Sequence, residues 1–166
     1  MTDFDPATHR MIPEQRWFDD FKIGERFVLP SRTMTEAVFL AFQGASGDNH
    51  PVHYDVEYCK ARGMPSLLAH GFQSLAQTAP GAGLFPYMIE DSLVGFIEQS
   101  SRFHKPVFAG DTLYPLLEIN ELSPNRVRGA KPWAAAHYFL APIRRDRVYT
   151  SCAISTARFR AKPSRA

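Results

Sequence analysis

Apolar and polar residues alternate along most of the second half of the chain, from about residue 92 onward. Alternation with a period of two is typical of strands that bury one face. Turn sequences of the types Gly-Asp, Ser-Pro-Asn and Arg-Arg-Asp divide this half into four stretches, of which the last alternates most clearly. We therefore expect four strands, within the ranges 92–108, 111–122, 133–143 and 147–160.

The first half of the chain has helix patterns and helix-capping residues instead. A strand-like stretch, 21–35, comes first and is rich in aromatic and β-branched residues. Thr35 then precedes an apolar stretch, 36–46, and its hydroxyl can accept a first-turn N–H as a helix N-cap. Asp55 has the same place before a second short helix, 56–62, which the glycine that follows should end.

A third helical stretch begins at Gly71 and contains almost no charge. A helix without a charged face is expected to be buried on most sides, and Pro80 should kink or end it near its middle. One strand, then helices, then a series of antiparallel strands indicates an α+β domain whose sheet packs on a buried helix. We assign this domain to residues 17–162 and interpret residues 1–16, which are polar and contain two prolines, as a loose N-terminal arm.

Composition narrows the class of protein. With 166 residues and 45% apolar content, the chain is long enough for one domain with a sizeable core. Its formal charge of +2 is too small to indicate nucleic-acid binding, although basic residues near the C-terminus would suit a phosphorylated small molecule. We expect neither a signal peptide nor a membrane-spanning segment. Cys59 and Cys152 are far apart and are expected to be buried thiols, which suggests a soluble, cytoplasmic protein.

The polar decapeptide "SGDNHPVHYD", residues 46–55, interrupts the apolar pattern between the first two helices. It has three interpretations: metal ligands, an acid–base site, or a polar turn that happens to be rich in histidine. Histidine and carboxylate groups do bind zinc. However, a proline separates His50 from His53, and no cysteine or compact ligand set completes the pair. The metal interpretation is therefore the least favoured, and we expect no metal.

Acid–base chemistry fits these residue types better. Asp48 and His53 lie five positions apart on a loop that Pro51 stiffens, so their side chains can converge. A carboxylate beside an imidazole exchanges protons near neutral pH when burial tunes the pair. Downstream, a free N–H at Gly71 can stabilise negative charge on a substrate oxygen. Taken singly, the three residues also have structural explanations: a turn cap, a core histidine and a glycine at a helix start.

Two stretches of the sequence resemble one known family. "SGDNHPVHYDVEYCKARGMPSLLAHG", residues 46–71, resembles the hydratase-2 motif of the MaoC-like family of hot-dog proteins, and "RFHKPVFAGDTL", residues 102–113, resembles a further segment of that family. The resemblance covers about residues 18–122. The positions that match the first motif are Gly47, Asp48, Pro51, His53, Asp55, Ala61, Gly63, His70 and Gly71.

The resemblance implies a hot-dog fold, in which a long antiparallel sheet wraps around a central helix, and a homodimer or higher homo-oligomer. It implies hydration of a trans-2-enoyl-CoA to an (R)-3-hydroxyacyl-CoA, or the reverse dehydration, without a cofactor: the CoA thioester is the substrate. Asp48 and His53 would be the catalytic pair that activates water and delivers a proton to the α-carbon. The Gly71 N–H would polarise the thioester carbonyl. Neither nucleic acid nor a membrane is expected as a partner.

One position departs from the family pattern, which has an asparagine directly before the proline. Here that position is His50, and the asparagine is one residue earlier, at Asn49. His50 is a candidate substrate contact, loop hydrogen-bond donor or third titrating group, and His70 is a further candidate substrate contact. Tyr54 and Phe72 are candidates for lining an acyl tunnel, with ordinary core packing as the alternative.

Two basic residues next to the second family segment, Arg102 and Lys105, are candidate contacts for the phosphates of CoA. Two other functions are alternatives to a hydratase. A hot-dog thioesterase would also use a carboxylate and a helix N-terminus, but it would release free CoA. A non-catalytic acyl-CoA-binding subunit would have no need of an acid–base pair.

Overall fold

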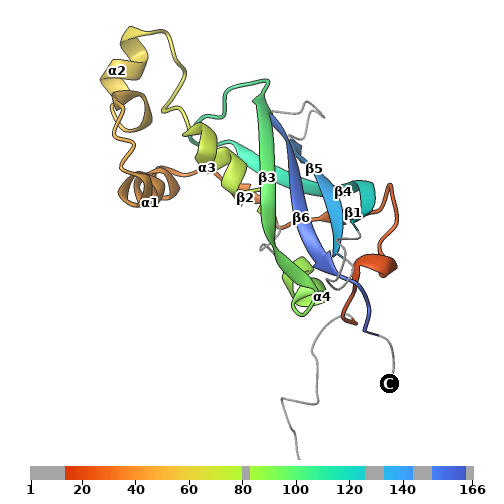
Figure 1. Cartoon of the computed structure of the whole chain (residues 1–166). Helices are drawn as coiled ribbons and strands as arrows, with labels where there is room; N and C mark the ends of the chain where they lie inside the picture. The colour runs from red at the N-terminus through yellow and green to blue at the C-terminus, as the bar shows by residue number, and fades with distance from the viewer. Residues whose placement is uncertain (1–13, 80–82, 126–132, 144–150, 164–166) are drawn as a thin grey trace, which may run out of the picture.

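The computed structural model describes residues 14–79, 83–125, 133–143 and 151–163, with the backbone alone at 124–125, 133–143, 151–156 and 158 (Figure 1). Short strands come first, then helices, then long strands, in the order expected. The elements in chain order are η1 (Phe18–Asp20), β1 (Arg26–Val28), β2 (Arg32–Thr33), α1 (Glu36–Ser46), η2 (Pro51–His53), α2 (Val56–Ala61), α3 (Gly71–Ala76), α4 (Phe85–Ile89), β3 (Leu93–Phe103), β4 (Thr112–Asn125), β5 (Trp133–Ile143) and β6 (Ser151–Arg160).

The strands form one antiparallel sheet in the order β1-β4-β5-β6-β3, and β2 also pairs with β4. Strands β4, β5 and β6 follow one another as a meander, whereas β3 pairs with β6 and β1 pairs with β4. Segments from both sides of the helical region therefore meet in the sheet. The predicted α+β class, an antiparallel sheet combined with helices, is confirmed.

Prolines explain two differences from the predicted strands. The single strand expected over 21–35 is divided into β1 and β2, because Pro30 between them has no N–H to donate to a ladder. Conversely, β4 continues through Pro124, where the sequence predicts a turn. Strand β1 pairs with β4 only at residues 116–118. The outer edge of β4 near Pro124 thus faces no other strand of the described sheet, and a proline is tolerated there.

The first two helices begin as predicted; α1 also ends as predicted, and α2 ends one residue earlier than expected, at Ala61. Thr35 caps α1, its hydroxyl accepting the Val38 N–H at 3.3 Å. The carboxylate of Asp55 caps α2 by accepting the Tyr58 N–H at 2.9 Å. The glycine after α2 has a left-handed φ of 69°, a conformation that suits glycine and stops the helix.

The charge-poor stretch forms two short helices, α3 and α4, in place of one longer helix. Helix α3 ends at Ala76, a few residues before Pro80, as expected where a proline disfavours helical backbone before it. Burial on most sides is wrong for α3, because Phe72 is 76% exposed whereas Gln73, Ser74 and Leu75 are buried. No helix in the described part of the chain has the length and apolar character to span a bilayer.

Buried side chains form two clusters. The first lies between the sheet and helices α3 and α4, and includes Leu75, Phe85 and Phe159. The second joins the start of β4 to α1 and α2, and includes Phe39 and Cys59. Cys59 is a buried free thiol, as predicted, whereas the side chain of the second cysteine lies outside the described part.

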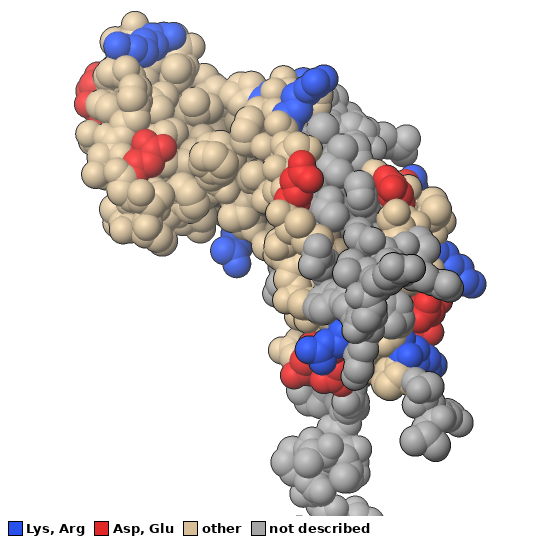
Figure 2. Space-filling view, viewed as in Figure 1, with Lys and Arg blue, Asp and Glu red and all other residues tan. Residues whose placement is uncertain are grey.

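Helices α1 and α2, with η2 between them, form a lobe that projects beyond the end of the sheet at which α3 begins (Figure 1). The face of this lobe visible in Figure 2 carries few charged side chains. Buried apolar residues alone do not explain its order: the loop between α1 and α2 is also held by polar contacts. That loop contains most of the predicted site.

The described end of the predicted arm is bonded to the domain. The Arg16 guanidinium donates to both carboxylate oxygens of Glu25, at 2.5 and 2.9 Å, and lies over the ring of Phe21. The Arg16 N–H also donates to the backbone carbonyl of Met88 at the end of the helical region, at 2.6 Å. Residues 1–13 lie outside the described part, so the boundary at residue 16 stays a prediction.

Candidate active site

The loop from Asp48 to His53, called here the Asp48–His53 loop, begins where α1 ends. Gly47 has a left-handed φ of 73°, which turns the chain out of the helix. The Asp48 N–H donates to the Ser46 hydroxyl at 3.2 Å, and the Gln43 side-chain amide donates to Asn49 at 2.7 Å. The end of α1 thereby fixes the first half of the loop, while the Asp48 carboxylate stays 54% exposed.

His50 orders the second half of the loop. Its Nδ1 accepts the Val52 N–H at 3.3 Å and so caps the single turn of η2, Pro51–His53. The ring also packs edge-to-face against Tyr58, with centroids 5.7 Å apart. A side chain that accepts from the backbone holds the turn in place. His50 therefore positions the loop as a hydrogen-bond acceptor, whereas the sequence-based alternative gave it as a donor.

His53 is buried and is oriented by a backbone carbonyl. Its Nδ1 lies 2.6 Å from the carbonyl oxygen of Leu68, which can only accept, so the ring proton is on Nδ1. Nε2 then carries the lone pair and faces Asp48 Oδ2 at 3.8 Å. A gap of this length is too long for a direct hydrogen bond. The two groups can instead both hydrogen-bond to one water molecule that lies beside them.

The surroundings of His53 keep its ring neutral. Burial, the largest effect, lowers the pKa of His53 below the usual 6.5, and the neighbouring His70 and His50 lower it further. The Leu68 carbonyl and the Asp48 carboxylate act in the opposite direction. The net effect is a lowered pKa, so that Nε2 is free to accept a proton at neutral pH.

His70 stacks on the ring of His53 and is buried in the protein interior. The two imidazole rings stack in parallel, with centroids 3.6 Å apart and 21° between the planes. His70 is 1% exposed, its Nε2 is 3.1 Å from the Asp48 backbone oxygen and its Nδ1 is 3.3 Å from Gln73 Oε1. Both ring nitrogens are thus engaged by the protein, which does not favour the predicted direct contact between His70 and substrate.

Gly71 is the first residue of α3, so no carbonyl of the helix accepts its N–H. A cavity of about 320 Å³ lies beside it, lined by the start of α3, the end of β3 and residues 104–107. The ring of Phe103 closes over the glycine: a Cβ on Gly71 would lie 3.2 Å from that ring. The absence of a side chain on Gly71 therefore lets the Phe103 ring pack against the start of α3.

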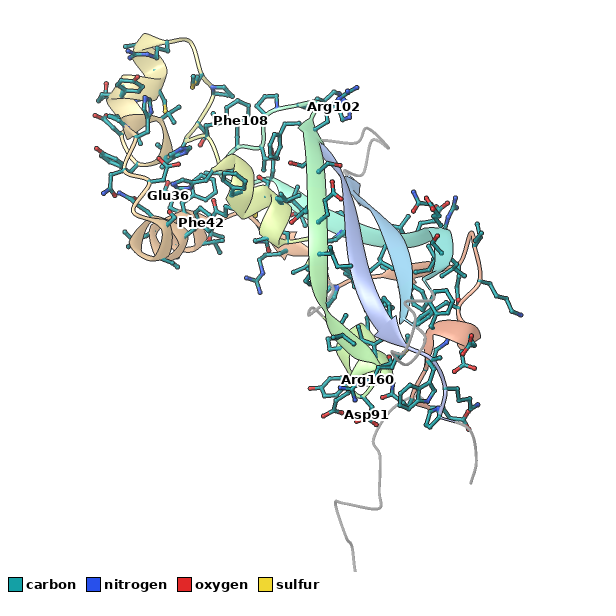
Figure 3. All side chains as sticks on the ribbon, viewed as in Figure 1. Glu36, Phe42, Asp91, Arg102, Phe108 and Arg160 are labelled. Atoms are coloured by element: carbon teal, nitrogen blue, oxygen red, sulfur yellow. The ribbon has the colours of Figure 1, made fainter. Side chains whose placement is uncertain are left out.

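The remaining predicted contacts lie at the surface. Tyr54 and Phe72 are 49% and 76% exposed, so core packing within this chain is wrong for both. Lys105 lines the cavity beside Gly71, whereas Arg102 lies near the same end of β3 and points outward (Figure 3). Of the two basic candidates, only Lys105 thus borders the cavity.

A metal site has some geometric support but an incomplete set of donors. One ligand atom from each of Asp48, His53 and His70 lies within 4.8 Å of the others. The nitrogens of His70 and Nδ1 of His53 are already engaged by protein oxygens, and Asp55 caps α2. The Asp48 carboxylate and His53 Nε2 remain, fewer than the three or four protein ligands that zinc uses. The geometry favours acid–base chemistry.

Sequence reasoning missed Gln73, Phe103 and the Leu68 carbonyl. Gln73 is buried. Its Oε1 lies 3.3 Å from His70 Nδ1, and its side-chain nitrogen donates to the Val38 carbonyl at 2.7 Å. Its spacing of three from His70 on a helical stretch was an available signal, since such residues share a face. The contacts of Phe103 and Leu68 arise from long-range packing, for which no local signal exists.

The fold and the loop together define a hot-dog protein with a carboxylate–imidazole pair. The chain belongs to the MaoC-like dehydratase family, since the family's sequence profile, described as a MaoC like domain, matches residues 20–131. It is similar over 92% of its length to a conserved hypothetical protein of Mycobacterium tuberculosis with a double hotdog fold, at 26% identity and a TM-score of 0.74. The chain corresponds to 46% of that protein. The expected hot-dog fold is confirmed.

Two curated relatives are each 28% identical to the chain over the aligned residues. The chain is 28% identical over 114 residues to an (R)-specific enoyl-CoA hydratase of Rhodospirillum rubrum, covering 66% of this chain and 74% of the relative. It is also 28% identical over 124 residues to a 3-hydroxybutyryl-CoA dehydratase of Methylorubrum extorquens, covering 71% of this chain and 74% of that relative. Both relatives are named for adding or removing water.

Proposed function

We propose that the protein is a hydro-lyase that adds water to a trans-2-enoyl-CoA to give an (R)-3-hydroxyacyl-CoA, or catalyses the reverse dehydration. The observation that carries this proposal is the 3.8 Å separation of Asp48 Oδ2 and His53 Nε2. A carboxylate and a neutral imidazole at that distance can both hydrogen-bond to one water molecule that lies beside the pair. Family membership and the two relatives named for this chemistry support the assignment.

In the proposed reaction, one water molecule is divided across the double bond. Its hydroxyl forms a bond to C3 while its remaining proton passes to the Asp48–His53 pair, and the pair delivers a proton to C2. The electrons of the double bond move toward the thioester oxygen as the C3–O bond forms. The Gly71 N–H donates to that oxygen and stabilises its charge. The net change is H and OH added, with no redox step and no cofactor.

Replacement of the pair tests the assignment. Asp48→Asn and His53→Ala should each lower kcat by at least about 10²-fold, because general acid–base groups contribute about 10²–10⁴-fold. The assay follows loss of the enoyl absorbance of crotonyl-CoA, with circular dichroism to verify folding. Glu57→Gln is the matched control, since it removes an exposed carboxylate from α2 in the same lobe and should leave turnover unchanged. Near-normal turnover by both site variants contradicts the proposal.

The same incubation separates the alternative functions. Release of free thiol from crotonyl-CoA indicates a thioesterase, whereas loss of absorbance without thiol indicates hydration. Saturable binding of the CoA ester without either change indicates a non-catalytic binding subunit. The lowered pKa of His53 favours an acid–base enzyme over a binding subunit, because a neutral buried imidazole beside a carboxylate serves proton transfer.

Lys105 is proposed to contact a phosphate of CoA at the mouth of the cavity beside Gly71. Such a contact is the same in the ground state and the transition state, so its loss raises KM and leaves kcat unchanged. We expect this pattern for Lys105→Ala in saturation kinetics with crotonyl-CoA. A fall in kcat with unchanged KM contradicts the contact. Arg102→Ala, at the outward-pointing position nearby, should have the smaller effect.

A further inference from the structure

A buried polar chain connects α1, α3 and the Asp48–His53 loop beneath the site. His70 and Gln73 are each 1% exposed, although both are polar. Gln73 donates to the Val38 carbonyl of α1, while His70 contacts Gln73 on one side and the Asp48 backbone on the other. Buried polar groups of this kind are retained only when they are hydrogen-bonded. The positions of the hydrogen atoms on the side chains of His70 and Gln73 can therefore be assigned from the atoms that these side chains face.

The orientation of the Gln73 amide is fixed by its other end. Its nitrogen lies 2.7 Å from the Val38 carbonyl oxygen, an acceptor, so that atom must be the NH₂ group. Oε1 consequently faces His70 Nδ1 at 3.3 Å and accepts from it. The opposite orientation would place two oxygens 2.7 Å apart. His70 Nδ1 thus requires a proton.

The other nitrogen of His70 also faces an acceptor. Nε2 lies 3.1 Å from the backbone oxygen of Asp48, which has no proton to donate. A neutral imidazole carries one N–H, and can satisfy only one of the two acceptors, whereas the imidazolium form satisfies both. An unmade hydrogen bond at a site this buried is costly.

A buried charge is costly unless it is hydrogen-bonded and paired, and the groups around His70 meet both conditions. The Asp48 carboxylate offers an oxygen within 4.8 Å of a His70 nitrogen. On the α1 side the ring meets the uncharged rings of Phe39 and Phe42, with centroids 6.4 and 5.0 Å away. The other titratable groups in this cluster are His53, stacked on His70, and His50, beyond His53.

We propose that His70 is a positioning residue that carries a proton on both ring nitrogens, holds the Asp48 backbone in place and keeps the stacked His53 neutral. The charge lies against the face of His53, 3.6 Å from centroid to centroid. A second proton on His53 would place two cations in contact, which is unfavourable. His53 Nε2 therefore remains a base. The kinetic part of this inference rests on the proposed hydro-lyase function, whereas the protonation state does not.

Nitrogen-15 NMR of the unaltered protein tests the protonation state without any assay of turnover. Long-range ¹H–¹⁵N correlations at neutral pH should show one histidine with both ring nitrogens protonated, and this signal should be lost in His70→Phe. His53 should show one protonated and one unprotonated nitrogen. A single neutral tautomer for His70 overturns the proposal. This measurement remains decisive even where a variant fails to fold.

The pH dependence of turnover tests the effect on His53. His70→Phe keeps an aromatic ring in the stack but removes the charge and both donors. We expect kcat to fall by up to about 10²-fold, as for a misplaced catalytic group, and the acid limb of kcat/KM to move to higher pH. Gln73→Met, which removes one acceptor, should move the limb in the same direction. Phe42→Leu is the control: it alters packing on the same ring, and its acid limb should not move.

A folded His70→Phe variant whose pH profile superimposes on that of the unaltered protein overturns the positioning role. So does an equal shift in Phe42→Leu, because the effect would then come from packing alone. The proposed hydro-lyase function and the proposed role of His70 can be refuted independently of each other. Absence of hydration by the unaltered protein, with His70 doubly protonated, would refute the hydro-lyase function and leave the assignment of His70 standing.

Discussion

His50 replaces the asparagine of the MaoC-like motif without leaving the Asp48–His53 loop uncapped. Its Nδ1 accepts the Val52 N–H at the start of η2, a task that the side-chain oxygen of asparagine can also perform. Asn49, one residue earlier, is bound to Gln43 of α1 instead. The exchange of residue type at this position thus preserves an acceptor, and the loop needs an acceptor more than it needs a particular side chain.

This view predicts an ordered series at position 50. His50→Ala should lower the free energy of unfolding by about 0.5–1 kcal/mol, the usual loss for a helix N-cap, and should lower kcat because η2 carries His53. His50→Asn should restore both quantities. Urea unfolding at pH 7 and turnover of crotonyl-CoA measure them. An alanine variant as stable and as active as the unaltered protein would show that the cap is unimportant.

At the residue scale, sequence reasoning found the groups that local spacing brings together. Asp48 and His53 share a short loop, so their convergence was predictable. The tautomer of His53 was not, because it depends on the Leu68 carbonyl, fifteen positions away. His70 is the clearest example: its type suggested a contact with substrate, whereas its burial and its two acceptors indicate a role within the protein.

Between elements, the Arg16–Glu25 pair joins the segment before η1 to the residues that lead into β1. The pair is bidentate, partly buried and next to the ring of Phe21. The hydrogen bond from Arg16 is the main reason that the pKa of Glu25 lies below its usual 4.5; burial opposes the shift. An exposed surface pair would contribute little to stability, but this bidentate and partly buried geometry is more favourable.

The lowered pKa of Glu25 determines how its contribution to the free energy of unfolding changes with pH. Because Glu25 loses its proton more readily in the folded state, its stabilisation is complete above about pH 4.5 and is lost as the pH falls through the lower folded value. Glu25→Gln should therefore reduce the free energy of unfolding by about 1 kcal/mol at pH 7, and by progressively less in acid. Urea denaturation across pH 3–7 measures this difference.

Glu57→Gln is the matched control for this experiment. Its partner is Lys60, three positions along α2, and both side chains are well exposed. Pairs of this kind contribute at most about 0.5 kcal/mol. Equal losses for the two variants at pH 7 would contradict a special role for the Arg16–Glu25 pair.

The elements themselves were predictable where local chemistry determines them. Thr35 and Asp55 cap the helices assigned to them because a cap depends only on the residues that follow it. The course of β4 through Pro124 depends instead on how far β1 extends beside it. The division of the charge-poor stretch was expected from Pro80, but the exposed position of Phe72 was not, because it depends on where the lobe and the sheet leave α3 uncovered.

Over the whole molecule, β3 stands out as an outer strand whose first half has an apolar surface. It pairs with β6 on one side and has no other strand beside it in the described sheet. Proteins usually protect such an edge with charge, proline or a covering segment. Here Val94, Phe96 and Ile97 are exposed along it. Alternation alone predicted one buried face for this strand, yet apolar side chains are exposed at successive positions.

We therefore predict that two copies of the chain associate through β3 as a homodimer. In a symmetric dimer both copies carry the substitution, so its free-energy cost enters the interface twice. Burial of a phenylalanine contributes about 1.5–3 kcal/mol, so Phe96→Lys should raise the dimer Kd by at least about 10²-fold. Size-exclusion chromatography with light scattering at micromolar concentration measures the mass. Val28→Lys is the control, because Val28 is exposed on β1, at the opposite edge of the sheet, and should leave the dimer intact. A monomeric unaltered protein, or a Phe96→Lys dimer as stable as that of Val28→Lys, would contradict association through β3.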